Sequence, residues 1–345
     1  MTVKNMFRVV LIVGTIVSLF FVPWSYLFTA LRPLPNDIQK EVDYFAEKRF
    51  DGVIVAVKTE TDEFIYTAGL HNKATNEEAY PEAIFKIASI SKLYVATATS
   101  MLIDEGLLSR DDLLSDLLPE YKDSVTNAKE ITLAQLVNHT SGIKNFIFVE
   151  GFPGDEPILN NTDMMKFVVN QEASFKPGEK YEYSNSNYVL LGLILDSVLG
   201  YDHHRYIEKN IFEPLGLMDT YNLMSDVNDK DRIMTGYDKN FEEDLNKEMD
   251  HTASSGSMLA TASDVALFIE ALNKGYLLKR SAQEIYSSLY VYSHTGLVPG
   301  YQSIARYDRE LDVTFVIFTS TSGGYSWNLI DNLYSRVRKI YAKNQ

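Results

Sequence analysis

The sequence predicts the α/β class, an α+β sandwich in which one antiparallel sheet is flanked by helices. Strand-like segments lie at both ends of the globular region, and a helical, loop-rich block separates them. The chain has 345 residues, of which 46% are hydrophobic, so it can bury a large core. The economical packing puts the terminal helices on one face of the sheet and the helical block on the other.

The first part of the sheet follows a helix predicted from Asp37 to Arg49. Two runs rich in strand-forming residues, Gly52–Val57 and Phe64–Ala68, flank a polar turn at residues 59–62. A helix is predicted to start at Ser89 and to end near Gly106, and it is buried because the stretch through Tyr94 to Ile103 is apolar or small on every side.

The rest of the chain supplies the helical block and the remaining strands. A connector and a short helix come first, and the region from there to about Phe268 is mostly helical. The later elements are expected at Leu107–Tyr121 (connector), Thr132–Val137 (helix), Tyr290–His294, Tyr301–Tyr307 and Val313–Thr319 (strands), and Trp327–Tyr341 (final helix).

The N-terminus carries an apolar run, Val9–Phe28, that is long enough to span a bilayer. Lys4 and Arg8 precede it, which predicts a cytoplasmic N-terminus and an extracellular catalytic domain. A cleaved signal peptide is the competing interpretation, but its apolar region is normally shorter. We therefore expect a single-pass signal-anchor in the cell membrane, with Pro23 tolerated inside it.

The expected domain organisation follows from this anchor. Residues 1–30 form a cytoplasmic stub and the transmembrane segment, and residues 31–36 are a short linker stiffened by two prolines. Residues 37–345 form the globular domain, with a sheet subdomain at 37–85 and 265–345 and a helical subdomain at 86–264. A retained anchor would hold this domain close to the membrane surface.

Composition excludes several classes of function. The net charge of −15, without a basic stripe, argues against nucleic acid as a partner. The chain has no cysteine, which excludes disulfides, thiol catalysis and cysteine-ligated zinc. The histidines form no metal-ligand spacing, and the adjacent pair His203 and His204 is expected to point in different directions on a helix, so no metal site is predicted from them.

Ser89 and Lys92 are the first candidate catalytic residues. They lie three apart at the predicted start of the long helix, so the lysine amine can reach the serine hydroxyl. A serine needs a neighbouring base to become nucleophilic, and burial lowers the pKa of a lysine toward neutrality. The spacing also occurs at Ser141 and Lys144, where Gly142 argues for a turn instead.

Two further clusters could complete a catalytic cleft. Tyr183 and Asn185 lie two apart before an apolar helix; a tyrosine beside a cationic lysine can relay protons, and an asparagine can orient a substrate amide. The third cluster is His294-Thr295-Gly296-Leu297. A glycine-bearing strand permits close approach to a ligand and can offer an N–H group to a developing oxyanion.

In this order and spacing, the three clusters resemble the motifs of the serine β-lactamase and penicillin-binding-protein superfamily. The nearest branch is the class C β-lactamase-like group, which includes D-alanyl-D-alanine carboxypeptidases and esterases. The resemblance extends over about residues 37–341. Further similar segments are Ile131-Thr132, Leu136–Gly142, Pro177-Gly178, Pro214–Leu217, Ser254–Gly256 and Thr261–Asp264.

The resemblance implies a β-lactamase/transpeptidase-like fold, with an all-helical domain beside the sheet domain and the active site between them. Ser89 would be acylated, while Lys92 and Tyr183 share the proton transfers. The N–H groups of Ser89 and Leu297 would form the oxyanion hole, and Asn185 would hold the substrate. His294, Thr295 and Gly296 would complete the substrate-binding strand, and no cofactor is implied.

One departure from the family pattern concerns the substrate. His294 stands where penicillin-binding proteins and most β-lactamases have a lysine that recognises a carboxylate, which leaves room for esters. Residues 242–246 superficially match the Glu-x-x-Leu-Asn element of class A β-lactamases, but they lie in an acidic, surface-type stretch.

The sequence therefore predicts a membrane-anchored serine hydrolase that acts on D-alanyl groups of the cell envelope. The bond could be a peptide, or an ester on a teichoic acid-type polymer. A β-lactamase is the second hypothesis. A penicillin-binding sensor or binding module, which is acylated without turnover, is the third.

Overall fold

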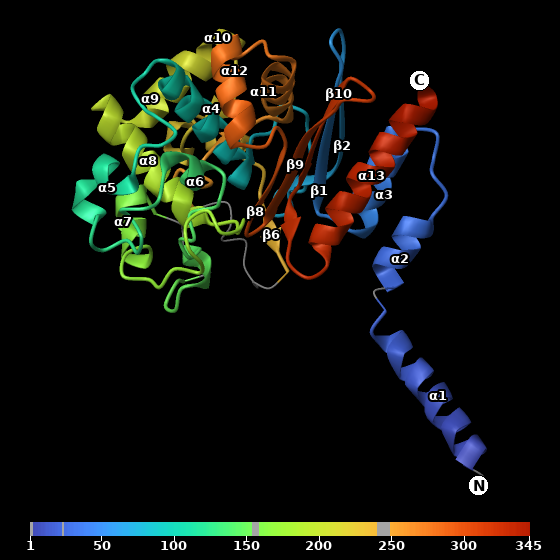
Figure 1. Cartoon of the computed structure of the whole chain (residues 1–345). Coiled ribbons are helices and arrows are strands. Elements are labelled where there is room, and N and C mark those ends of the chain that lie inside the picture. The colour runs from blue at the N-terminus through green and yellow to red at the C-terminus, as the bar shows by residue number, and fades with distance from the viewer. Residues whose placement is uncertain (1–2, 23, 154–158, 240–248) are drawn as a thin grey trace.

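The computed structural model describes residues 3–22, 24–153, 159–239 and 249–345, and Figure 1 shows the whole chain. The Glu-x-x-Leu-Asn match at residues 242–246 lies outside the described residues. Where the structure is described, a sheet stands between two groups of helices, and an N-terminal helix extends away from them (Figure 1).

The central sheet joins strands from both ends of the globular region, as predicted. Its order is β3-β2-β1-β10-β9-β8, and all of its neighbouring strands are antiparallel. β1 pairs with β10 in the register Val55↔Ile317, and with β2 in the register Val55↔Tyr66. The strands are β1 Gly52–Lys58, β2 Glu63–Asn72, β3 Glu77–Glu78, β8 His294–Val298, β9 Tyr301–Asp308 and β10 Val313–Thr319.

The two faces of the sheet are covered by different helices. The terminal helices α3 (Ile38–Lys48) and α13 (Ser326–Asn344) lie on one face, where Phe45 and Leu333 join a separate apolar core. α11 (Ala262–Lys274) and the helical block cover the other face, and their core is continuous with Ile54 and Phe318 of the sheet. This arrangement is the predicted sandwich.

The helical block surrounds the buried helix α4 (Ser91–Asp104), which packs against α8 (Asn185–Leu199) and α12 (Arg280–Leu289). Two small sheets, β4-β7-β5 and β6-β11, connect this block to the central sheet. The remaining elements are α5 Leu114–Leu117, α6 Leu133–Val137, α7 Asn161–Met164, α9 His203–Ile207, α10 Glu213–Leu215, β4 Phe85–Lys86, β5 Thr220–Tyr221, β6 Tyr237–Asp238, β7 Leu259–Ala260 and β11 Thr321–Ser322.

One predicted strand is displaced. The sequence predicts a strand at Tyr290–His294, but β8 begins only at His294. The reason is that Tyr290 is the C-cap of α12, and its N–H group donates to the carbonyl oxygen of Tyr286. The strand-forming side chains at 290–292 therefore belong to a helix end and its connection.

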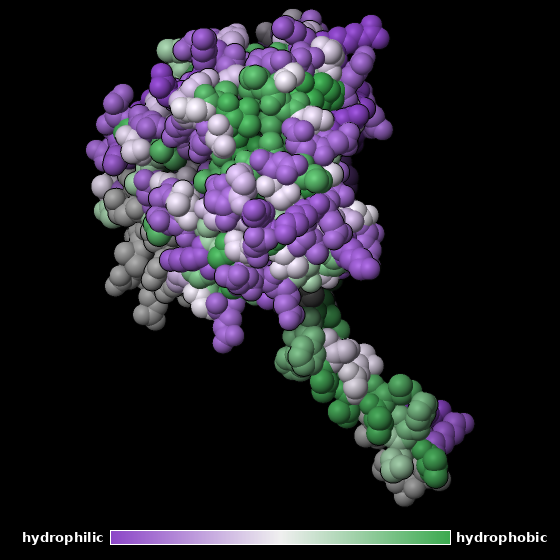
Figure 2. Space-filling model, turned by 60° about the vertical axis from the view of Figure 1, so that its left-hand side comes forward, coloured by the Kyte–Doolittle hydropathy of each residue, from purple (hydrophilic) through white to green (hydrophobic). Residues whose placement is uncertain are grey.

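The N-terminal apolar run is divided between two helices. α1 (Val3–Phe20) exposes its apolar side chains, and in Figure 2 it projects as a green helix from a largely hydrophilic body. α2 (Trp24–Leu31) packs on α13 instead. One continuous helix over Val9–Phe28 is therefore wrong. The reason lies in the sequence, because the proline at position 23 disfavours helical backbone at the residue before it.

The segment after α2 is fixed to the globular domain by a buried arginine. Arg336 on α13 pairs with Glu41 at 2.7 Å and donates to the carbonyl oxygens of Arg32 and Pro33. Because Glu41 is fully buried, this pair lies in a low-dielectric region where an unpaired charge would be costly. The domain and the base of the N-terminal segment are thus joined by specific contacts.

Candidate active site

Ser89 lies in a short 3₁₀ turn, η1 (Ala88–Ile90), immediately before α4. Ala88 has φ +51°, a left-handed conformation that costs a non-glycine residue free energy and is often found at functional sites. The turn is held by Ser91, whose hydroxyl donates to the Ala88 carbonyl oxygen and accepts from the Met258 N–H group. The nucleophile candidate is therefore presented by a strained, well-fixed turn.

Lys92 faces Ser89 as the spacing predicts. Its Nζ atom lies 3.0 Å from Ser89 Oγ, and it also donates to the carbonyl oxygen of Ser255. Lys92 is fully buried, and this burial holds the pKa of its amine well below the ordinary value. A neutral amine at this distance can accept the proton of the serine hydroxyl.

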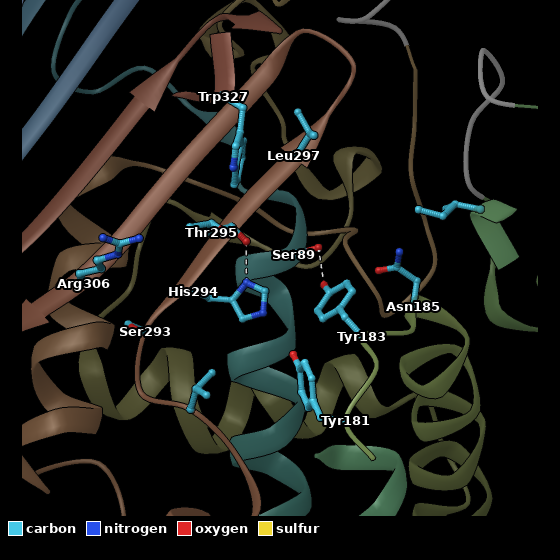
Figure 3. A pocket seen from close by; sticks show the side chains of 12 residues that line it. Ser89, Tyr181, Tyr183, Asn185, Ser293, His294, Thr295, Leu297, Arg306 and Trp327 are labelled. Carbon is cyan, nitrogen blue, oxygen red and sulfur yellow. Dashed lines mark hydrogen bonds between the residues drawn. The ribbon is translucent and has the colours of Figure 1, made fainter. Parts of the chain in front are cut away.

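Tyr183 completes a three-residue cluster at Ser89 (Figure 3). Its hydroxyl donates to Ser89 Oγ at 3.0 Å. Burial raises the pKa of Tyr183 above its ordinary value, and the hydrogen bond to Ser89 only partly opposes this effect. The expectation that Lys92 favours a phenolate is therefore not supported, because burial dominates and the pKa of the phenol is raised. A protonated phenol can instead deliver a proton to a leaving group.

Asn185 is positioned by a residue that the sequence analysis missed. The side-chain oxygen of Asn145 accepts from both the backbone N–H and the side-chain amide of Asn185, at 3.2 and 3.3 Å. Asn185 is also the first residue of α8, so its backbone is fixed by the helix. Its amide lines the cavity beside Ser89 (Figure 3).

The glycine-bearing strand is the edge strand β8, and it runs beside the Ser89 turn. A Cβ atom on Gly296 would lie 2.2 Å from the carbonyl oxygen of Ile87, so only glycine permits this approach. Thr295 and Leu297 line the cavity. Since β8 has a neighbour on one side only, its other edge can present an N–H group to a substrate.

His294 is neutral and engaged on both sides of its ring. Its Nδ1 atom lies 2.5 Å from the Thr295 carbonyl oxygen, which can only accept, so Nδ1 carries the proton. Its Nε2 atom then accepts from the Tyr290 hydroxyl at 3.0 Å. Burial and the neighbouring Lys92 lower the pKa of His294 to about 4. The sequence-based expectation of a largely neutral histidine agrees with this geometry.

A second buried histidine supports the cluster from behind. His139 accepts at Nδ1 from the Ser184 N–H group, and its ring packs 4.5 Å from the Tyr183 ring. Burial lowers the pKa of His139 to about 3. The sequence analysis assigned no role to His139, although it lies in the family-like segment Leu136–Gly142, or to Tyr290, because their contacts arise only when distant segments meet.

These residues surround an open cavity of about 490 Å³. The candidate residues Ser89, Tyr183 and Asn185 lie on its walls with the β8 residues, whereas Lys92 is buried behind Ser89. The sequence analysis did not select the other side chains that line it, because isolated aromatic, apolar or basic residues have no distinctive spacing. They are Ile147, Tyr181, Val291, Ser293, Arg306 and Trp327.

The second Ser-x-x-Lys segment has no comparable geometry. The Ser141 hydroxyl donates to the side-chain oxygen of Asn187 at 2.8 Å and accepts from the Ile143 N–H group. Gly142 has φ +78°, which turns the chain between Ser141 and Lys144. Ser141 is therefore a structural residue, as the central glycine predicts.

A grouping with metal-ligand character lies elsewhere. Asp202, His203 and His204 have ligand atoms within 4.8 Å of one another and line a different cavity. The rings of His203 and His204 are only 4.2 Å apart, so the expectation that adjacent histidines point in different directions is wrong here.

Comparison with known families identifies the chain. A model of the beta-lactamase family matches residues 38–291, and the chain belongs to that family, within the β-lactamase and penicillin-binding-protein superfamily of serine hydrolases. Protein flp of Staphylococcus aureus (strain COL) is 30% identical over 194 residues, which cover 54% of this chain. Penicillin-binding protein 4* of Bacillus subtilis (strain 168) is 24% identical over 254 residues, 68% of this chain. The matches span 39% and 55% of those relatives' lengths.

Solved structures confirm the predicted fold. D-amino acid amidase from Ochrobactrum anthropi SV3, complexed with D-phenylalanine, superposes with a TM-score of 0.77 at 20% identity, covering 89% of this chain and 98% of that one. A penicillin-binding protein from Bacillus halodurans gives 0.72 at 22% identity, covering 87% and 99%. A class C beta lactamase gives 0.68 at 20% identity, covering 88% and 98%. At these identities the likeness concerns the fold alone.

Proposed function

We propose that the chain is a membrane-anchored serine hydrolase that works through an acyl-enzyme on Ser89. The observation that carries this proposal is the placement of Ser89 Oγ 3.0 Å from both Lys92 Nζ and Tyr183 Oη, at the wall of an open cavity. The Lys92 amine, in its unprotonated form, takes the serine proton as the hydroxyl attacks the substrate carbonyl. Tyr183 and Lys92 then return a proton to the leaving group.

The remaining candidate residues have binding roles in this proposal. The backbone N–H groups of Ser89 and Leu297 hold the oxyanion, and Asn185 orients the substrate. His294, Thr295 and Gly296 form the strand along which the substrate lies. The proposed division into a sheet subdomain (37–85 and 265–345) and a helical subdomain (86–264) puts this site where the two parts meet.

The proposed substrates are D-alanyl peptide or ester groups of the cell envelope. The state of His294 favours groups without a free carboxylate close to the scissile bond. His294 is neutral, with both ring nitrogens already hydrogen-bonded, so it offers no cation to a carboxylate. A surface-attached ester fits both this site and a domain held near a membrane.

The proposed anchor is α1. Its 18 residues extend for about 27 Å, close to the roughly 30 Å of a bilayer's hydrocarbon core, and its apolar side chains are exposed. Lys4 and Arg8 favour a cytoplasmic N-terminus. Under this proposal the full chain stays in the membrane fraction after alkaline extraction, and externally added protease reaches the globular domain in intact cells.

The test uses the full chain in detergent, as wild type and as Ser89→Ala. Both are exposed to D-alanyl peptides, D-alanyl esters on polymer, and β-lactams, while mass spectrometry follows the acyl adduct and released product. We expect D-alanine release by the wild type alone. Brisk cleavage of simple esters without D-alanine release would contradict the substrate class.

Two other outcomes identify the alternatives. Cephalosporin turnover above about 1 s⁻¹ would indicate a β-lactamase. A persistent penicillin adduct on Ser89 with no turnover of any substrate would indicate a binding or sensor module.

A further inference from the structure

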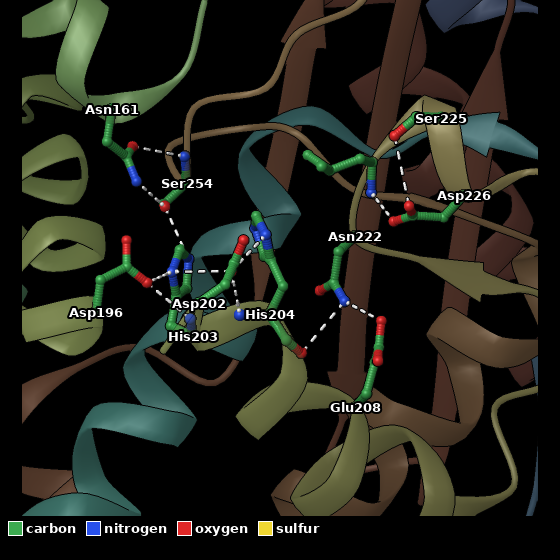
Figure 4. Close-up of polar contacts among 11 residues, drawn as sticks. Asn161, Asp196, Asp202, His203, His204, Glu208, Asn222, Ser225, Asp226 and Ser254 are labelled. Atoms are coloured by element: carbon green, nitrogen blue, oxygen red, sulfur yellow. Dashed lines mark hydrogen bonds and ion pairs between the residues drawn. The ribbon is translucent and has the colours of Figure 1, made fainter. Parts of the chain in front are cut away.

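We propose that Asp196, Asp202, His203 and His204 form a binding site for a divalent transition-metal ion of the zinc type. This site is separate from the proposed active site and independent of the proposed function. It lies between the end of α8, the start of α9 and the loop at Ser254 (Figure 4). The four side chains line a cavity of about 230 Å³.

Ligand atoms of three residues, Asp202, His203 and His204, lie within 4.8 Å of one another, and Asp196 adjoins this group through His203. His203 Nδ1 lies 2.7 Å from Asp196 Oδ1 and 3.7 Å from Asp202 Oδ1. His204 Nδ1 lies 3.0 Å from the same Asp202 oxygen. Ligands of a tetrahedral zinc ion stand about 3.3 Å apart, given zinc–nitrogen and zinc–oxygen distances of about 2.0–2.1 Å. These three separations, from 2.7 to 3.7 Å, bracket that value.

His204 is a largely buried histidine whose ring nitrogens are not satisfied by hydrogen bonds within the described part of the chain. Neither of its ring nitrogens makes a hydrogen bond, although both atoms are buried and the side chain is only 12% exposed. The His204 Nδ1 atom lies 3.0 Å from Asp202 Oδ1, at ion-pair distance but outside hydrogen-bond geometry. A metal ion between them would satisfy both, since imidazole and carboxylate are both zinc ligands.

The surroundings also provide outer-shell support. His203 Nε2 lies 2.9 Å from the Ser254 hydroxyl, which in turn accepts from the Asn161 amide at 2.7 Å. Metal-ligating histidines are commonly oriented by such a hydrogen bond on the ring nitrogen that does not bind the metal. Gly192 makes room for this contact, because a Cβ atom there would lie 2.2 Å from both Ser254 Oγ and Asn161 Nδ2.

The donor set limits which ion can bind. Two imidazole nitrogens disfavour calcium and magnesium, which prefer oxygen ligands, and the chain has no cysteine to favour softer ions. When a metal ion binds His203 Nδ1, the proton between Nδ1 and Asp196 leaves that nitrogen. The neutral ring then carries its proton at Nε2. No redox step is involved.

The test uses untagged full-length chain in detergent, stripped with a chelator and titrated with Co²⁺ and then Zn²⁺. We expect one equivalent of Co²⁺ with visible d–d absorption, displaced by Zn²⁺ but not by Ca²⁺. Zinc at a hundredfold excess over its Kd should raise the Tm by about 5 °C.

The variants separate the site from its structural background. Asp202 caps α9 by accepting from the His204 N–H group, and asparagine caps helices equally well, so Asp202→Asn keeps the cap and removes the charge. Asp202→Asn and His204→Ala should each weaken Co²⁺ binding at least about tenfold. His294→Ala should leave Co²⁺ binding unchanged.

Three results would overturn the proposal. The wild type could fail to bind Co²⁺ stoichiometrically, or the wild type and both site variants could bind it with equal affinity. Loss of binding in His294→Ala would place the metal at the active-site histidines instead. Unchanged Tm values of the two site variants in chelator exclude unfolding as the cause of lost binding.

Discussion

Ser89-x-x-Lys92 and Ser141-x-x-Lys144 have the same spacing, but the structure gives them different surroundings. In the first, a 3₁₀ turn leads directly into α4, and the lysine amine lies 3.0 Å from the serine hydroxyl. In the second, Gly142 at φ +78° reverses the chain, and Ser141 donates to Asn187. Spacing brings two side chains together only when the intervening backbone is helical.

The largest expected difference between the two segments concerns the serines. Ser89→Ala should abolish acyl-adduct formation and lower kcat/KM at least about 10³-fold, because it removes the proposed nucleophile. Ser141→Ala should leave kcat/KM within a few-fold and instead lower the free energy of unfolding by about 1–3 kcal/mol, since Asn187 loses its buried partner. Mass spectrometry and urea titration measure the two effects. A large activity loss in Ser141→Ala at unchanged stability would break the comparison.

The lysines give the next contrast. Lys92→Met should lower kcat/KM about 10²–10⁴-fold, the usual contribution of a positioned general base. Lys144→Met should leave it nearly unchanged. Because burial holds the pKa of Lys92 well below its ordinary value, wild-type kcat/KM should rise with pH as this amine loses its proton. The rise should be absent from the residual activity of Lys92→Met, and its persistence there would assign the base elsewhere.

Contacts between residues that are close in the sequence could be predicted, whereas contacts between distant residues could not. Ser89 and Lys92 are a local pair, so their spacing and the apolar helix that follows predict the contact. One antiparallel sheet built from N- and C-terminal strands was predicted because strand-like runs occur at both ends of the globular region, but the pairing of β1 with β10 was not. Asn145, in contrast, meets Asn185 across 40 residues, through a hydrogen bond that exists only after the chain has folded.

The errors have the same origin. Tyr290, Val291 and Tyr292 have strand-forming side chains, and the sequence analysis assigned them to a strand, but packing of α12 extends the helix to the Tyr290 cap. The pKa of Tyr183 was expected to be lowered by a cationic Lys92. Burial reverses this expectation, because it raises the pKa of the phenol, whereas the lowered pKa of Lys92 is as predicted.

Two glycines extend the comparison to the backbone. Gly296→Ala would put a Cβ atom 2.2 Å from the Ile87 carbonyl oxygen and push β8 away from Ser89. We expect kcat/KM to fall about 10²-fold, the cost of an approximately 1 Å misplacement at a reacting centre. Gly142→Ala should mainly lower stability, because φ is +78° and the Cβ atom would lie 2.1 Å from the Phe175 carbonyl oxygen. Measuring kcat/KM of the folded fraction distinguishes these outcomes, and equal activity losses would contradict them.

The smallest expected effect concerns the buried histidines His294 and His139. His139 lies two residues before Ser141, and its ring packs on Tyr183 of the Ser89 cluster. The pKa of His294 is about 4 in the folded chain, against an ordinary 6.5. Between these values the unfolded chain binds more protons, so the free energy of unfolding should fall as pH drops from 6.5 toward 4. His294→Asn should reduce this fall, while His139, with a pKa of about 3, still contributes.

Urea midpoints at pH 7 and pH 5 measure this difference. Ser141→Ala is the matched control, because it lowers stability without removing a titrating group and should keep the wild-type dependence on pH. If His294→Asn loses as much stability in acid as the wild type, His294 does not titrate in this range. The neutral imidazole, and with it the argument that His294 offers no cation to a substrate carboxylate, would then have to be abandoned.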